Sequence, residues 1–107
     1  MESAIELEFP ALLQIIGGYL NQDHTIYGPE LEDAVMAFIA DASADEIKQG
    51  RDDIARFLKT KAGGLDAALE ELTSGDWARE PGTTAGEYLH WLDGLLALSQ
   101  EHDGHPI

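Results

Sequence analysis

Residues 9–20 of the chain read FPALLQIIGGYL, and this stretch is the clearest indication of the fold class. Its large apolar residues recur three and four positions apart, a spacing that places them on one face of an α-helix. These residues are Phe9, Leu12, Leu13, Ile16, Tyr19 and Leu20. Pro10 suits the first helical turn, where a backbone N–H has no partner inside the helix. We therefore predict an amphipathic helix with Pro10 in its first turn.

Two glycines, Gly17 and Gly18, interrupt this apolar pattern. Each glycine destabilises a helix by about 1 kcal/mol relative to alanine, so the presence of two glycines in this pattern has to be explained. We expect it to allow another helix to approach closely, or else to end the first helix early. The polar segment 21–25 that follows predicts a loop.

Two further helices are predicted in the centre of the chain. One runs from Pro29 to about Ala42 and carries acids in its first turn, where the helix dipole favours negative charge. The next follows Ser43, which forms a Ser-x-x-Glu capping box with Glu46, and it stops at the glycine pair 63–64.

A short fourth helix is expected near residues 65–73, and a fifth follows the second capping box, Thr84 to Glu87. We expect Trp77 to anchor the loop between them, because so large an indole is rarely left in water. The tail, residues 100–107, should fray. No alternation typical of strands competes with these helices. The predicted fold is all-α: a compact, single-domain bundle of about five short helices over residues 1–107.

Charge is the strongest compositional feature: 21 acidic residues against 6 basic ones give a net charge of −15. Residues 1–46 hold ten acids and no Lys or Arg, and residues 80–107 hold five acids and none. The stretch 47–79 holds the other six acids and all six basic residues. The electrostatic field of so negative a protein repels nucleic acid and anionic membranes, and it speeds encounter with basic proteins. A solvated surface that only keeps the protein soluble is the alternative.

The compartment is also indicated by the sequence. There is no cysteine, which excludes disulfides and thiolate metal sites and suits a reducing compartment. Residues 1–8 hold three Glu and no Lys or Arg, the opposite of a secretory leader, and the apolar runs are too short to cross a bilayer. We expect a cytoplasmic protein that binds neither nucleic acid nor membrane.

Candidate catalytic and metal-binding residues are few. His102 and His105 could ligate a metal, but they lie in the Gly- and Pro-containing tail. Asp23 and His24 could form an acid/base pair, although no nucleophile lies near them. His90 is expected to be a partly buried imidazole. We therefore predict no catalytic residue, no cofactor and no metal. A small helical metal-dependent enzyme and an acidic adaptor or structural subunit remain as alternatives.

Acids and aromatic residues cluster around the first loop and the start of the second helix, and again near residue 76. Tyr and Trp side chains ringed by acids are suited to binding a basic protein surface. Alternatively, the acids cap the helix and the aromatic rings pack inside. The predicted partner-binding residues are Asp23, Tyr27, Glu30, Glu32, Asp33, Asp76 and Trp77.

The stretch Phe9-Pro10-Ala11-Leu12, followed by GGYLNQD at residues 17–23, resembles the N-terminal signature of a family of bacterial contact-dependent growth inhibition (CDI) immunity proteins. The acidic second helix, the Ser-capped third helix and a last helix with Tyr88 and Trp91 are similar to it too. Members often carry an aromatic residue directly after the Gln-Asp pair, where this chain has His24.

This resemblance implies a cytoplasmic, helical, non-enzymatic protein. Its partner would be the toxic C-terminal domain of a CDI effector, a cell-surface protein delivered by a neighbouring cell. Many of these toxin domains are nucleases, which must offer a basic surface to phosphates. The resemblance therefore implies neutralisation of the toxin in a tight heterodimer formed through an acidic surface.

Overall fold

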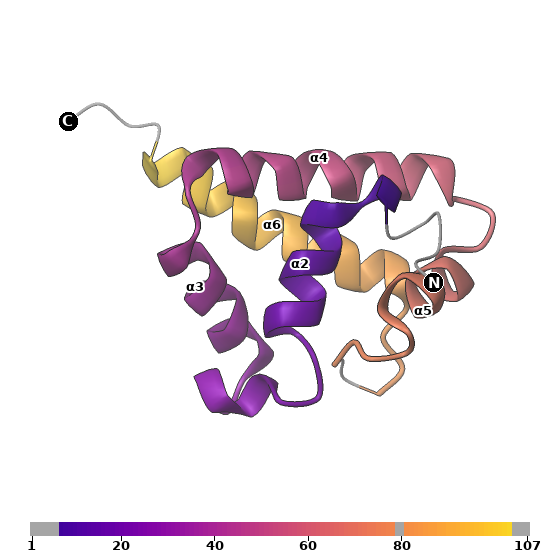
Figure 1. The fold of residues 1–107 in the computed structure, drawn as a ribbon, viewed down its shortest axis with the longest axis horizontal. Helices are drawn as coiled ribbons and strands as arrows, with labels where there is room; N and C mark the ends of the chain where they lie inside the picture. Colours follow the sequence, from indigo (N-terminus) through magenta and orange to yellow (C-terminus); the bar gives the residue numbers. More distant parts are fainter. Residues whose placement is uncertain (1–6, 79–80, 104–107) are drawn as a thin grey trace.

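Helices make up the regular structure of this protein, which we describe from a computed structural model for residues 7–78 and 81–103 (Figure 1). No strand occurs among these described residues. From Phe9 onward the elements are α2 (Pro10–Tyr19), the 3-10 turn η1 (His24–Tyr27), α3 (Leu31–Asp41), α4 (Ala44–Thr60), α5 (Leu65–Thr73) and α6 (Ala85–Asp103). The all-α prediction is confirmed.

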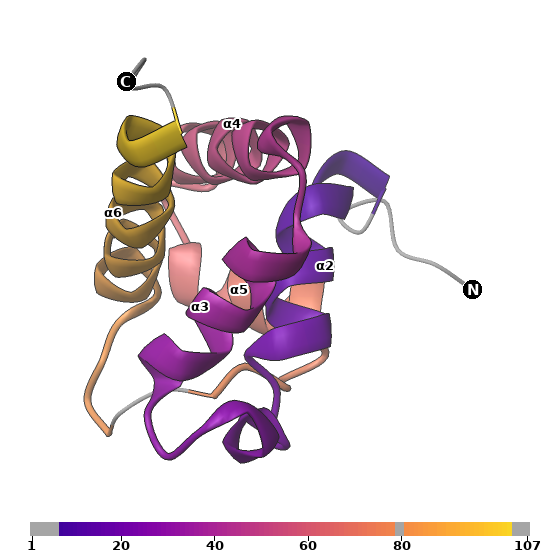
Figure 2. The same ribbon diagram turned by 90° about the vertical axis from the view of Figure 1, so that its left-hand side faces the viewer.

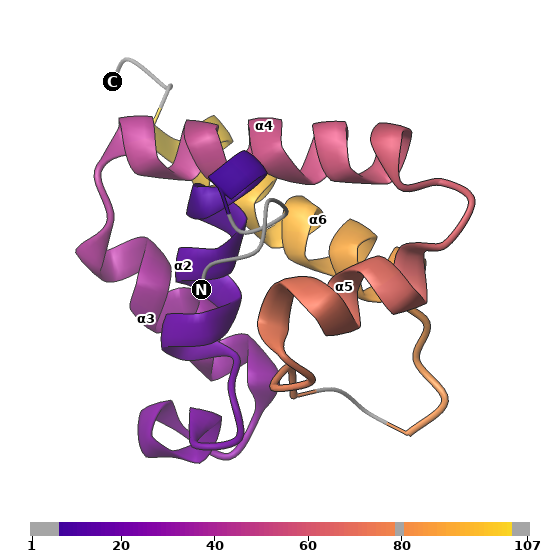
Figure 3. The same cartoon turned by 45° about the vertical axis from the view of Figure 1, so that its right-hand side comes forward.

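The arrangement of the helices leaves two loops at one end of the bundle. α4 and α6 pack side by side, α2 packs beneath α4, and α3 and α5 lie on either side of α2 (Figures 1 and 2). The segments 21–30, 74–78 and 81–84 lie at the end opposite α4 (Figure 3). We call these segments the loop end.

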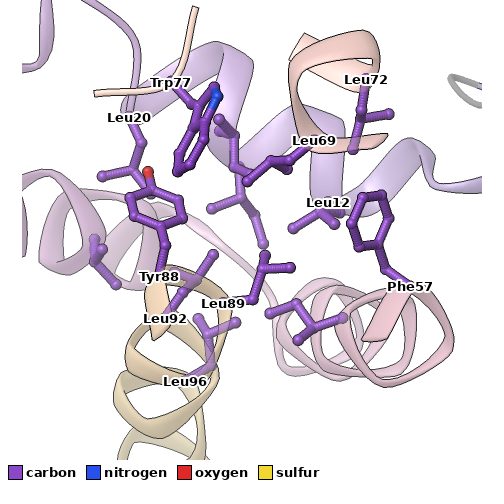
Figure 4. Packing of buried hydrophobic residues seen from close by; sticks show 14 of the residues in the cluster. Leu12, Leu20, Phe57, Leu69, Leu72, Trp77, Tyr88, Leu89, Leu92 and Leu96 are labelled. Carbon is purple, nitrogen blue, oxygen red and sulfur yellow. The ribbon is translucent and has the colours of Figure 1, made fainter. Parts of the chain in front are cut away.

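The core takes apolar side chains from each of α2, α3, α4, α5 and α6. Figure 4 shows labelled residues of α2, α4, α5 and α6 packed together. The helix spacing seen in the sequence explains this, because each helix turns one apolar face inward. The largest fully buried side chains are Phe9, Leu12, Ile15, Ile16, Leu20, Ile47, Ile54, Phe57, Leu69, Leu72, Leu89 and Leu92.

The start of α2 is fixed by a residue from α4. The Asp53 side chain is buried, and its Oδ2 accepts hydrogen bonds from the backbone N–H groups of Ala11 (2.9 Å) and Leu12 (3.1 Å). These are donors that the helix itself leaves unpaired, and Phe9, the N-cap residue, makes no side-chain cap. Arg56 pairs with Asp53 and lies over the Phe9 ring, 5.0 Å from its centroid. The Phe-Pro-Ala-Leu stretch therefore docks α2 onto α4.

The expectation that Gly17 and Gly18 bring another helix close is wrong. α2 continues through both glycines; a Cβ at Gly17 would meet only Leu13 of the same helix, and one at Gly18 would meet nothing within 4 Å. The close approach lies instead at Gly50 of α4, where a Cβ would sit 2.6 Å from Cδ1 of Ile15. Gly50 lies in a polar stretch, so no apolar pattern marked it in the sequence.

Both predicted capping boxes are present. Ser43 and Glu46 exchange two hydrogen bonds of 3.2 Å at the start of α4. Thr84 and Glu87 do the same at the start of α6, at 3.1 and 3.2 Å. The second helix begins at Leu31, not at Pro29, because Glu30 takes the N-cap position.

Two expectations about the last helix are corrected. α6 extends to Asp103, so residues 100–103 are helical and not frayed, while residues 104–107 lie outside the described residues. The helix continues because no glycine or proline occurs between Leu95 and Asp103. His90 is exposed and not partly buried, because its position on α6 faces away from the neighbouring helices.

Tyr88 carries a buried hydroxyl with no hydrogen-bond partner among the described residues. Burial raises its pKa above the usual range, so the group is a neutral phenol. We expect Tyr88→Phe to leave the free energy of unfolding unchanged or to raise it by up to about 1 kcal/mol, since a desolvated hydroxyl is removed. Urea unfolding checks this prediction, and a loss above about 1 kcal/mol would contradict it.

Candidate functional site

Charge is segregated in space as well as along the chain. Five of the six basic residues lie on α4 or directly after it: Lys48, Arg51, Arg56, Lys59 and Lys61. The described residues of the loop end, and those of α3, carry acids but no Lys or Arg; Arg79 lies outside the described residues. α4 lies at the edge of the bundle opposite the loop end (Figure 1). The charged residues that the structure describes at the loop end are all acidic.

The predicted site residues lie at this loop end or at the start of α3. Asp23 is exposed at the N-cap of η1, Glu30 is exposed at the N-cap of α3, and Glu32 is exposed in its first turn. Asp33 is half-buried, and its Oδ2 accepts from the backbone N–H of Glu30 at 3.0 Å. Tyr27 is 36% exposed. Four carboxylates and one aromatic ring therefore lie within eleven residues, on η1 and at the start of α3.

Asp76 joins the two loops to each other. Its Oδ1 accepts a hydrogen bond from the backbone N–H of Gln22 at 3.0 Å, across 54 positions of sequence. The backbone N–H of Ala78 also donates to the carbonyl oxygen of Leu20 at 2.8 Å. These bonds bring Asp76 and the Gln-Asp pair together, which the sequence did not reveal.

The prediction that Trp77 contacts the partner conflicts with the burial of its side chain. Its side chain is only 5% exposed, its Nε1 donates to Glu70 at 2.8 Å, and its ring packs edge-on against Tyr88 at 4.9 Å (Figure 4). The expectation that it anchors the loop is confirmed. An indole buried in this way offers no surface to a partner, because the apolar core provides a better environment for it than water.

The GGYLNQD stretch builds a supported turn. Asn21 Nδ2 donates to the Gly17 carbonyl (2.8 Å), and the Tyr27 hydroxyl donates to the Gly18 carbonyl (3.3 Å). Tyr19 and Tyr27 stack with their ring centroids 5.3 Å apart. The glycines leave their carbonyl groups open to these donors, since no side chain covers them. The motif therefore holds η1 in place against the end of α2.

The Tyr19 hydroxyl contacts an acidic residue at the C-terminal end of α3. It donates to Oδ2 of Asp41 at 3.2 Å, and the ring packs edge-on against Phe38. Desolvation by burial raises the pKa of Tyr19, and the Asp41 charge raises it further. The hydroxyl therefore stays protonated at neutral pH and remains a donor.

A cleft of about 560 Å³ opens beside the predicted residues. It lies where the starts of α3 and α6 face each other, and its lining consists of Glu30, Leu31, Glu32, Thr83, Glu87, Tyr88 and Trp91. Three carboxylates around a half-buried indole favour a cationic side chain, through charge and through the ring face. The sequence predicted Glu87 only as a capping residue, and it did not indicate that Glu87 and Trp91 meet the start of α3.

No group of three or more His, Asp or Glu within residues 7–78 and 81–103 is placed to hold a metal ion. His105 of the candidate tail pair lies outside the described residues, and the side chain of His102 is not described. In the part of the chain that the structure describes, no helix is both long and apolar enough to cross a membrane.

Searches of curated proteins and of solved structures returned nothing similar. The sequence model of the CdiI immunity protein family matches residues 8–97. This range includes the helices α2 to α5 and most of α6. That match confirms the resemblance carried by the Phe-Pro and Gly-Gly-Tyr stretches, and this chain therefore belongs to the CdiI immunity protein family.

Proposed function

We propose that this protein protects the cell that makes it by binding the toxic C-terminal domain of a CDI effector in the cytoplasm, as a tight 1:1 complex. Membership of the immunity family supports a toxin as the partner. The observation that supports the binding surface is the separation of charge: the charged residues described at the loop end are acids, whereas Lys and Arg residues lie on α4.

The proposed mechanism is occlusion without chemistry. A nuclease toxin binds phosphates through Lys and Arg side chains, so its substrate surface is basic. An acidic surface of matching shape attracts that region, docks on it and excludes the nucleic acid. The excess of acids among the residues described at the loop end also speeds the encounter with a basic partner.

The proposed contact residues are Asp23, Tyr27, Glu30, Glu32, Asp33 and Asp76. The cleft next to Glu30 and Glu32 adds Glu87 and Trp91, which would receive a basic side chain of the toxin. Trp77 supports this surface from inside by holding the second loop.

The first test is growth rescue. Cells that express the C-terminal domain of the effector encoded immediately before this gene should stop growing, and co-expression of this protein should restore growth. The purified domains should form a 1:1 complex by light scattering. A toxin domain that still kills, or that does not bind, would contradict the proposal.

Salt dependence tests the electrostatic part. We expect the association rate with the toxin domain to fall at least roughly tenfold between low salt and 0.5 M NaCl, because screening removes the attraction between opposite charges. Stopped-flow mixing measures the rate. If the association rate does not change over this range, charge attraction does not drive the encounter, even where the complex still forms.

A further inference from the structure

Ile26 is the most exposed large apolar side chain among the described residues. It is 75% exposed, whereas its neighbour Tyr27 is 36% exposed and lies against Tyr19. Turns are built mostly from Gly, Pro, Asn, Asp and Ser, whose conformations or hydrogen bonds suit them. Nothing in η1 requires an isoleucine at this position, and Ile26 gains almost no burial there.

The backbone that carries Ile26 is held firmly. The Ile26 N–H donates to the Asp23 carbonyl at 3.1 Å, and that of Gly28 donates to Thr25 at 3.2 Å. The side chains of Asn21 and Tyr27 tie the two ends of the turn to α2, and η1 also packs against α3. An apolar group presented on such a support loses little conformational entropy on binding.

The surroundings of Ile26 are acidic. Asp23 precedes it by three residues and Glu30 follows it by four, and both are exposed. No Lys or Arg occurs in the described residues between Leu7 and Ile47. An apolar centre inside a charged rim is the usual plan of a protein–protein interface, where the centre resists dissociation and the rim guides encounter.

We propose that Ile26 is the central apolar contact of the toxin complex, inserting into an apolar hollow surrounded by Lys and Arg on the toxin domain. Charge complementarity selects this occupant, because Asp23 and Glu30, the described charged residues nearest to Ile26 in the sequence, are both exposed acids. The inference rests on the proposed function. It assigns different kinetic roles to the two kinds of side chain: the carboxylates determine the association rate, and Ile26 determines the dissociation rate.

The experiment compares Ile26→Ala with Leu98→Ala. Leu98 is a matched control because it is also an exposed aliphatic residue, at 56%, and it lies in the last turns of α6, away from the loop end (Figure 2). Both variants should keep the wild-type melting temperature, since neither side chain is buried. Surface plasmon resonance with the effector's C-terminal domain at two salt concentrations gives the two rates.

Ile26→Ala should bind roughly 10- to 100-fold more weakly, through faster dissociation, with the association rate and its salt dependence unchanged. Leu98→Ala should stay within about twofold of wild type. Wild-type affinity in Ile26→Ala would overturn this inference and leave the proposed function standing. A wild-type protein that does not bind the toxin domain would overturn both.

Discussion

Replacing Asp23, Glu30 and Glu32 together by lysine should weaken the toxin complex by at least about 1,000-fold and abolish growth protection. These carboxylates are exposed on η1 and at the start of α3, and two of them line the cleft. Each reversal removes an attraction and adds a repulsion with the basic face of the partner. Coupling energies of close charge pairs across an interface reach about 1.5 kcal/mol or more, so three changes exceed about 4 kcal/mol.

The matched control reverses three acids elsewhere. Asp45, Asp52 and Glu71 are exposed on α4 and α5, and their change to lysine shifts the net charge by the same amount. Asp45 also occupies the first turn of α4, as Glu32 does in α3, so the loss of favourable helix-dipole interaction is similar. The control should bind within about fivefold of wild type, because screening limits long-range effects.

Binding constants and growth rescue distinguish the outcomes. If both triple variants lose affinity equally, net charge and not the loop end accounts for recognition. If neither loses affinity, the toxin contacts another face. Circular dichroism of each variant must show the wild-type helical signal, so that a loss of binding is not a loss of fold.

Asp53→Ala should lower the free energy of unfolding by about 3 kcal/mol. The buried Asp53 carboxylate accepts the N–H groups of Ala11 and Leu12, and it pairs with Arg56. Alanine leaves two helix N-terminal donors without a partner and removes a negative charge from the positive end of the α2 dipole. The melting temperature should fall by roughly 13 °C.

Asp52→Ala is the control for this effect. Asp52 is the preceding residue of α4, and its side chain is exposed. Its removal should change stability by less than about 0.5 kcal/mol. Urea unfolding of both variants, followed by helical signal, gives the comparison. Equal stability of the two variants would show that the contact between Asp53 and α2 contributes nothing. At temperatures where Asp53→Ala remains folded, its toxin affinity should match wild type, because Asp53 lies on the α2–α4 contact and not at the loop end.

Local features of this protein were readable from the sequence. The capping boxes at Ser43 and Thr84 depend on residues three positions apart, so their geometry follows from the helix itself. The same holds for the apolar faces, whose spacing repeats with the helical turn. The acidity of the chain and its concentration in the flanks were equally evident, and the Phe-Pro and Gly-Gly-Tyr stretches indicated the family.

Only the tertiary structure determined how these parts meet. Asp53 reaches the start of α2 across about 41 positions, and Asp76 reaches Gln22 across 54. Trp77 follows a polar turn and Trp91 lies among apolar helix residues, yet Trp77 is buried in the core and Trp91 lines the acidic cleft. Sequence periodicity gives the face of a helix but not the neighbour that covers it. Which acids cap a helix, and which face a partner, therefore depends on helix packing, because burial is set by contacts between distant segments.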